Sequence, residues 1–109
     1  MTLRTPESRR RRATTLVTQV AEIIHKQGRR SSAPYYLILL DIRDVLADPE
    51  SDAETALADA AYGFKLLYGA PRGGFSEFYI HHDDPKQMAA ENQRFSELVS
   101  ELSSMIHDS

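Results

Sequence analysis

The sequence has no cysteine and no tryptophan, and only five glycines and five prolines among 109 residues. Without cysteine, a disulfide scaffold, a thiol nucleophile and a thiolate zinc site are all excluded. The longest unbroken apolar run covers six residues, 35–40, whereas a membrane-spanning helix needs roughly 20. No apolar core follows the N-terminal arginines, so we expect no secretory signal. These absences predict a soluble, cytoplasmic protein that does not associate with membranes.

The composition is that of an ordinary globular domain, with 41% hydrophobic and 27% charged residues. A chain of this length buries about two thirds of its unfolded surface, which is enough for one core without a disulfide or a structural metal. We therefore expect a single domain over residues 13–109 and no cofactor.

The net charge of −3 conceals a strong segregation of charge along the chain. Residues 1–30 contain eight basic and two acidic side chains, and residues 31–109 contain five basic and fourteen acidic ones. Residues 1–12, with Arg4 and the run Arg9 to Arg12, offer little to bury and predict a disordered basic tail. Clustered arginines can also bind nucleic acid, but the acidic body would repel a phosphate backbone, so we do not expect that partner.

Apolar spacing predicts a mostly α fold, a small four-helix bundle. Residues 16–24 and 34–46 carry apolar side chains at helical spacing, and Gly28 marks the end of the first helix. Over residues 35–40 the same pattern also fits a buried strand, although its continuation to Leu46 favours a helix. Because this second helix is apolar nearly all round, we expect it to be the central one.

Two further helices follow on either side of an irregular stretch. A capping box from Ser51 to Glu54 predicts the start of the third helix, which should end near Gly69. Residues 69–85 predict one structured loop or short extended segment. Asp84 and Pro85 predict the start of a fourth helix, whose stripe from Met88 to Ile106 suits a bundle seam.

Two short motifs have competing interpretations. The run from His81 to Asp84 contains four side chains that can bind a metal, but neighbours in an extended segment point in opposite directions, so we interpret it as a helix cap and expect no metal site. Gly73 and Gly74 suggest a phosphate loop but lack the following Lys-Ser/Thr of a P-loop, which favours an ordinary turn. No serine or histidine lies in a catalytic motif, so we expect no catalytic residues and no enzymatic activity.

Seven carboxylates lie within residues 41–59. Three of them, Asp41, Asp44 and Asp48, have the spacing i, i+3, i+7 and share one side of the second helix. Stacked like charges cost some stability, so this acidic stripe is explained either as a solvated face or as a docking face for a basic partner.

The stretch at residues 66–81, together with Asn92, Phe95, Leu98 and Leu102, resembles an uncharacterised family of small bacterial helical proteins. In that family a helix ends in Leu-Leu-x-x-Tyr/Phe-Gly-Gly, a Gly-Ser-Phe-Asn-Asp-Leu loop follows, and an Asn-x-x-Leu-x-x-Leu helix closes the chain. The likeness covers about 40 residues, and here Phe75-Ser76 stands in reversed order. The resemblance implies an immunity protein of a polymorphic toxin system, with no enzymatic activity.

The functional prediction is therefore a bacterial immunity protein, an antitoxin that occludes the active site of a secreted toxin with a basic cleft. Asp41, Asp44 and Asp48 would steer the encounter, and loop residues would anchor it, since aromatic and arginine side chains dominate interface energies. The expected anchors are Arg72, Phe75, Glu77, Phe78 and Tyr79. The alternative is a regulatory or scaffolding module that homodimerises through the seam at residues 88–106.

Overall fold

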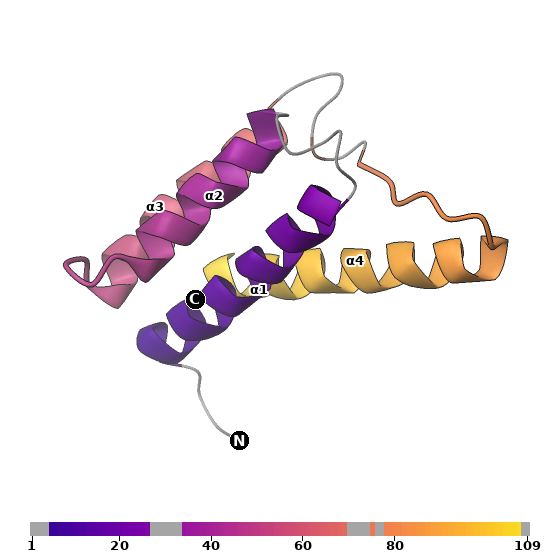
Figure 1. Cartoon of the computed structure of the whole chain (residues 1–109). Coiled ribbons are helices and arrows are strands. Elements are labelled where there is room, and N and C mark those ends of the chain that lie inside the picture. Colours follow the sequence, from indigo (N-terminus) through magenta and orange to yellow (C-terminus); the bar gives the residue numbers. More distant parts are fainter. Residues whose placement is uncertain (1–4, 27–33, 70–74, 76–77, 108–109) are drawn as a thin grey trace.

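The computed structural model describes residues 5–26, 34–69, 75 and 78–107 (Figure 1). These residues form four helices: α1 (Pro6–Lys26), α2 (Pro34–Ala47), α3 (Ala53–Leu67) and α4 (Pro85–His107). Within the same ranges no strand occurs. The predicted mostly α, four-helix fold is confirmed, and residues 35–40 are helical rather than extended.

α1 begins well before the apolar pattern that predicts it. The Thr5 hydroxyl accepts a hydrogen bond from the Ser8 N–H at 3.1 Å, and Pro6 and Glu7 occupy the first turn. A threonine cap followed by proline and an acidic residue is a favourable helix start. The prediction of a disordered tail over residues 1–12 is therefore wrong for residues 6–12, and residues 1–4 lie outside the described part of the chain.

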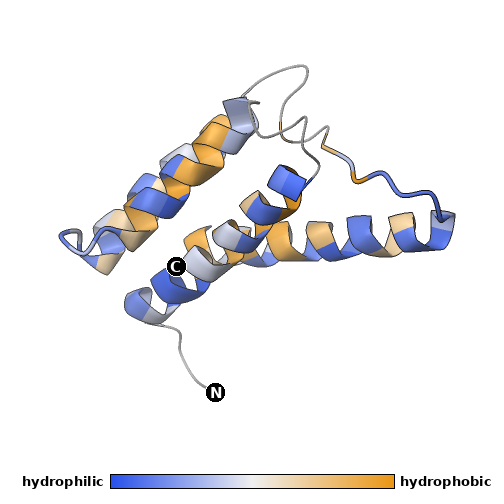
Figure 2. Cartoon of the chain, in the orientation of Figure 1, coloured by the Kyte–Doolittle hydropathy of each residue, from blue (hydrophilic) through white to orange (hydrophobic). Residues whose placement is uncertain are grey.

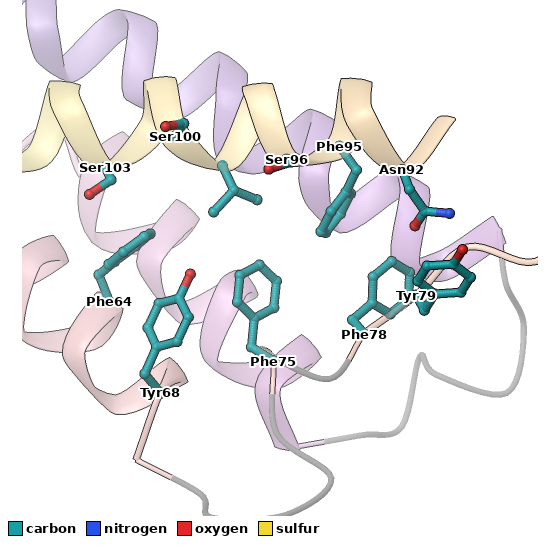
Figure 3. Close-up of a pocket in the computed structure, with 11 residues that line it drawn as sticks. Phe64, Tyr68, Phe75, Phe78, Tyr79, Asn92, Phe95, Ser96, Ser100 and Ser103 are labelled. Carbon is teal, nitrogen blue, oxygen red and sulfur yellow. The ribbon is translucent and has the colours of Figure 1, made fainter. Parts of the chain in front are cut away.

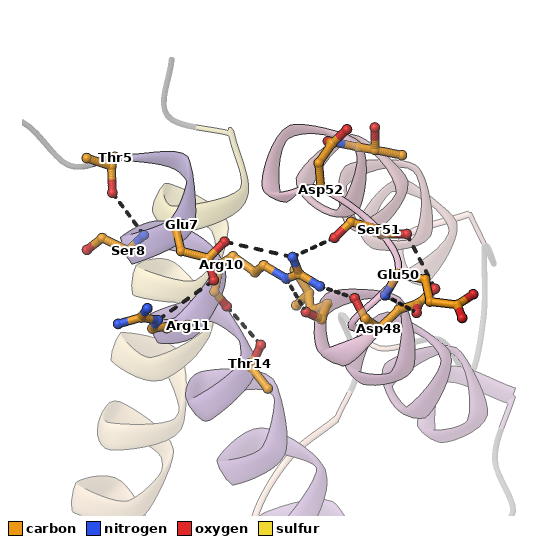
Figure 4. Close-up of polar contacts among 12 residues, drawn as sticks. Thr5, Glu7, Ser8, Arg10, Arg11, Thr14, Asp48, Glu50, Ser51 and Asp52 are labelled. Atoms are coloured by element: carbon orange, nitrogen blue, oxygen red, sulfur yellow. Dashed lines mark hydrogen bonds and ion pairs between the residues drawn. The ribbon is translucent and has the colours of Figure 1, made fainter.

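Arg10 ties the start of α1 to the end of α2 (Figure 4). Its guanidinium donates hydrogen bonds to the backbone oxygens of Leu46 at 2.6 Å, of Ser51 at 2.8 Å, and of Asp48. The last carbonyls of a helix lack donors within the helix and carry partial negative charge. Arg10 thus caps the C-terminus of α2 from a different helix.

Arg9 and Arg12 fasten α1 to α4 in a similar way. Arg9 donates to the carbonyls of Met105 at 2.9 Å and Ile106 at 3.2 Å, both in the last turn of α4. Arg12 donates two hydrogen bonds to the Glu101 carboxylate, at 2.7 and 2.9 Å. Three arginines of the run therefore hold helices together.

The core lies around α1, which packs against all three other helices. Its buried face is lined at helical spacing by Ala13, Leu16, Val17, Val20, Ala21 and Ile24. α2 is not the central helix that the sequence predicts, because it lies on the outside with Leu37 55% exposed. Figure 2 shows apolar and polar residues dividing each helix into two faces.

α2 and α3 form a tightly packed pair. A Cβ at Gly63 of α3 would lie 2.7 Å from Cγ1 of Ile42 on α2, which is closer than van der Waals contact. Glycine is therefore the residue that allows this approach. The start of α3 differs slightly from prediction: Asp52, not Ser51, is the N-cap, and its carboxylate accepts from the Thr55 N–H at 2.7 Å.

Much of the apolar stripe that predicts a bundle seam on α4 is buried in the chain's own core. Four members of the stripe are buried in the core shared with the other helices: Phe95, Leu102, Met105 and Ile106. These side chains are occupied by the chain's own core, so they do not form a free apolar face for a second copy.

The segment before α4 has no regular secondary structure and is held by one side chain. The Asn92 side-chain amide donates to the Ile80 carbonyl and its oxygen accepts from the Ile80 N–H, both at 2.9 Å. The same amide nitrogen donates to the Met88 carbonyl at 2.9 Å. Asn92 thereby fixes the backbone of Ile80 against α4, and the described residues between α3 and α4 form no strand.

Candidate functional site

The three aspartates of the predicted acidic stripe have different surroundings. Asp41 and Asp44 are exposed on α2, and Asp44 pairs with Arg43 at 3.3 Å. Asp48 lies beyond the end of α2, where its carboxylate accepts hydrogen bonds from the Glu50 N–H at 2.9 Å and the Ser51 hydroxyl at 3.3 Å. The stripe therefore stops at Asp44, because the helix ends before Asp48 and that carboxylate caps a turn.

A hollow of 320 Å³ runs between α2 and α3, and we call it the α2–α3 groove. Its floor consists of Ile38, Ile42, Val45 and Gly63, and its rim of Asp41, Asp59, Tyr62 and Leu66. Tyr62 and Leu66 are large side chains left 67% and 47% exposed. Neither Asp41 nor Asp59 has a hydrogen-bond or ion-pair partner within the described ranges.

Asp59, Tyr62 and Leu66 are functional candidates that the sequence reasoning missed. They follow one another at i, i+3 and i+7 on α3, off the buried stripe of that helix. A tyrosine and a leucine at such spacing on the polar side of a helix are the signal that could have found them. The spacing does not predict that Asp41 lies beside them, because that contact depends on how α3 packs on α2.

The predicted loop anchors lie elsewhere. Arg72 and Glu77 are outside the described residues. Phe75 and Phe78 are buried in the core, so the expectation that they are exposed anchors is wrong; only Tyr79 of the described three is exposed. The ring centroid of Phe75 lies 6.1 Å from that of Tyr35 and 5.9 Å from that of Phe95, so its ring packs in the core instead of facing solvent.

These aromatic residues do line a second hollow, of 680 Å³, which we call the aromatic trough (Figure 3). One wall consists of Phe64, Tyr68, Phe75, Phe78 and Tyr79. The other wall is the side of α4 that carries Asn92, Phe95, Ser96, Val99, Ser100 and Ser103. Burial raises the pKa of the Tyr68 hydroxyl, so this group stays protonated and can donate a hydrogen bond at neutral pH.

The groove and the trough lie on opposite sides of α3. Tyr62 and Leu66 line the groove, and Phe64 and Tyr68 line the trough. Residues two positions apart on a helix are separated by about 200° around its axis. The predicted steering residue Asp41 and the predicted anchor Tyr79 are thus not brought together in one patch.

The run from His81 to Asp84 serves the start of α4. The His82 Nδ1 accepts from the Asp84 N–H at 3.0 Å, and the Asp84 carboxylate accepts from the Lys86 N–H at 3.0 Å. Across the described ranges, no three histidine or carboxylate side chains gather as a metal site would require. The interpretation of this run as a helix cap agrees with these contacts.

Comparisons with family models, with curated protein sequences and with solved structures found no match to this chain. None of the four helices, as described, is both long enough and apolar enough to cross a membrane. The two hollows and the charges around them are therefore the features of the molecule that bear on function.

Proposed function

We propose that this chain is a non-enzymatic binding module that docks its α2–α3 groove onto a basic surface of another protein. The observation that carries the proposal is the pair of carboxylates, Asp41 and Asp59, set beside the exposed side chains of Tyr62 and Leu66. Exposed apolar side chains alone would not distinguish one apolar partner surface from another. Carboxylates alone would remain hydrated and contribute little binding energy. Together they fit a partner surface that combines lysine or arginine with apolar groups.

A complex of standard size would extend beyond the groove itself. A standard interface covers about 800 Å² on each partner, and the chain exposes 7146 Å² in total. Exposed residues elsewhere on the two helices, such as Leu37 of α2 and Thr55 of α3, would have to contribute to it. Tyr62 is of the residue type that most often dominates binding energy.

The specific form of the proposal is a cytoplasmic immunity protein that blocks the basic active-site cleft of a secreted toxin. This form rests on the resemblance of residues 66–81 and of the α4 positions to a family of small bacterial helical proteins. An acidic groove is suited to it, because opposite charges accelerate association and a toxin must be captured quickly.

The test compares two charge reversals of equal size in binding to the product of the neighbouring gene. The variant Asp41→Lys with Asp59→Lys alters the groove rim. The control, Glu22→Lys with Asp83→Lys, changes the net charge equally at exposed positions on α1 and before α4. At low salt we expect the groove variant to associate about tenfold more slowly than the control, with the difference shrinking as salt rises.

Two outcomes separate the general proposal from its specific form. Equal association rates for the two variants would show that the groove does not dock the partner. If the neighbouring product is no toxin, or if the wild-type gene does not rescue cells from it, the immunity form is wrong. Rescue by the wild type and the control but not by the groove variant would support both.

A further inference from the structure

The two walls of the α2–α3 groove carry matching rows of three side chains. The rows are Ile38, Asp41 and Val45 on α2 and Asp59, Tyr62 and Leu66 on α3. Both rows follow the spacing i, i+3 and i+7, so the members of each row lie along one side of their helix. At a rise of 1.5 Å per residue, such a row spans about 10 Å. The groove therefore follows about two turns of both helices.

The close approach of Gly63 to Ile42 fixes which members of the two rows face each other. α2 and α3 run in opposite directions, because the short loop 48–52 joins them and they pack side by side (Figure 1). Leu66 lies one turn after Gly63, and Ile38 lies one turn before Ile42, so Leu66 and Ile38 are opposite each other. Leu66 is 47% exposed, and this end of the groove therefore offers an open apolar surface.

The two carboxylates of the groove lie on opposite walls and at different positions along it. Asp41 precedes Ile42 in the sequence and stands at the middle of the groove on α2. Asp59 lies on α3 across from Val45, which is one turn beyond Asp41. Both carboxylates are exposed. An occupant of the groove would therefore meet one carboxylate on each flank, with about one helical turn between them along the axis.

We infer that the occupant of the groove is an amphipathic α-helix of the other protein, with lysine or arginine on both flanks of its apolar stripe. This inference rests on the proposed docking at the groove and not on its immunity form. Apolar side chains at the helical period would enter the hollow between the two walls. Basic side chains beside the stripe would pair with Asp41 on one flank and Asp59 on the other, as charges beside a coiled-coil seam do.

An extended segment is a less suitable occupant. Strand addition needs free backbone N–H and C=O groups at a sheet edge, and both walls of the groove are helices, whose backbone groups bond within the helix. A proline-rich segment needs a groove lined by aromatic side chains. Tyr62 is the one aromatic residue among the described residues that line this groove.

A second copy of this chain is also less suitable. Docking of groove to groove would bring Asp41 and Asp59 of one copy close to those of the other, and like charges repel. α1 carries the clustered arginines, but its apolar face is buried in the core. Arg9 and Arg10 already donate to carbonyls of α4 and α2. α1 thus has no free apolar stripe to place in the groove of a neighbour.

The test uses two fluorescein-labelled synthetic peptides with the whole chain. The first peptide has about 16 residues of alanine, leucine and lysine, with leucines at i, i+3, i+7 and i+10 and lysines on both sides of that stripe. The second has one central alanine replaced by proline, which breaks the helix and keeps every leucine and lysine. We expect the first peptide to bind one-to-one and to gain helical circular dichroism on binding. The proline peptide should bind at least about tenfold more weakly.

Two alanine variants locate the binding. Tyr62→Ala shortens the α3 wall and should weaken the first peptide about tenfold. Tyr79→Ala removes an exposed tyrosine outside the groove and should leave affinity within about twofold. Because both tyrosines are exposed, both variants should keep the fold. On the wild-type protein, intermolecular nuclear Overhauser effects should connect the leucine methyl groups of the peptide with those of Val45 and Leu66.

The outcomes separate the helix from the docking on which it rests. Equal affinity for the two peptides, binding without a gain of helix, or equal effects of the two tyrosine variants would overturn the inference. If charge reversal at Asp41 and Asp59 slows association with the product of the neighbouring gene while neither peptide binds, the docking stands and the helix is wrong. If that charge reversal has no effect on association, the docking itself is wrong.

Discussion

Replacing Arg10 with alanine removes the cap that α1 provides to α2. The guanidinium donates to three backbone oxygens, and its side chain is only 11% exposed. A hydrogen bond involving a charged group contributes about 1.5–3 kcal/mol. Because water can partly replace the lost donors at this edge of the bundle, we expect a total loss of about 3 kcal/mol rather than the full sum. That is a large fraction of the 5–15 kcal/mol or so that stabilises a typical domain.

Urea unfolding followed by circular dichroism measures this loss. With a slope of about 1.5 kcal/mol per molar urea, a loss of 3 kcal/mol lowers the midpoint by about 2 M. The slope itself should not change, since the buried core is the same in both proteins. Arg10→Lys should recover less than half of the loss, because an ammonium group cannot reach three carbonyls in the fixed geometry of a guanidinium.

Arg11→Ala is the matched control for Arg10→Ala. Arg11 is the next residue on the same helix, but its side chain is 80% exposed and, among the residues that the structure describes, makes a single 3.7 Å ion pair, with Glu7. An exposed ion pair of this kind contributes about 0–1 kcal/mol. If the two alanine variants unfold at the same urea concentration, Arg10 does not hold α1 to α2, and residues 6–12 do not pack as described.

Three further predictions concern stability. Tyr35→Phe should raise the free energy of unfolding by about 1 kcal/mol in a urea titration, because the buried Tyr35 hydroxyl has no hydrogen-bond partner in the described ranges. A decrease of the same size in the free energy of unfolding would contradict this prediction. The hydrogen bond from Thr55 lowers the pKa of Asp52, so its stabilising effect should be complete above the ordinary pKa of about 3.9 and disappear as the pH falls through the lower folded value. As the pH falls from about 3.9 through the lowered pKa of Asp52, the difference in melting temperature between the wild type and Asp52→Ala should become smaller. A difference that stays constant with pH would refute this stabilising role of the Asp52 carboxylate. Gly63→Ala should lower stability by about 1 kcal/mol despite the helix preference of alanine, since the added methyl meets Ile42; a rise in melting temperature would show that the two helices can move apart.

The helices could be predicted from sequence because each carries its own local pattern. The buried residues of α1 from Leu16 to Ile24 and those of α4 from Phe95 to Ile106 follow the helical period, and Asp84 and Pro85 mark the start of α4. Such patterns depend only on which side of a helix faces the core. They do not tell which helix lies in the centre, and the apolar character of α2 was misleading for that reason: part of its apolar surface is exposed at Leu37.

The candidate site was harder to predict because its residues meet only through packing. Asp41 was recognisable as an exposed carboxylate, but its neighbours Asp59 and Tyr62 lie on another helix. Phe75 and Phe78 have the residue type of interface anchors, yet Asn92 fixes the backbone of Ile80 in a position that leaves both rings in the core. Residue type alone does not distinguish an aromatic anchor from an aromatic core residue.

The arginine run shows most clearly how tertiary contacts reverse a local preference. Positive side chains near the first turn of a helix are unfavourable in isolation, because the N-terminus already carries the positive end of the helix dipole. The start of α1 lies beside the C-termini of α2 and α4, whose carbonyls accept from Arg10 and Arg9. The negative ends of two neighbouring dipoles thus outweigh the positive end of α1. Taken alone, the arginine run indicates a disordered tail. In the folded chain, its side chains connect the start of α1 to the C-termini of α2 and α4.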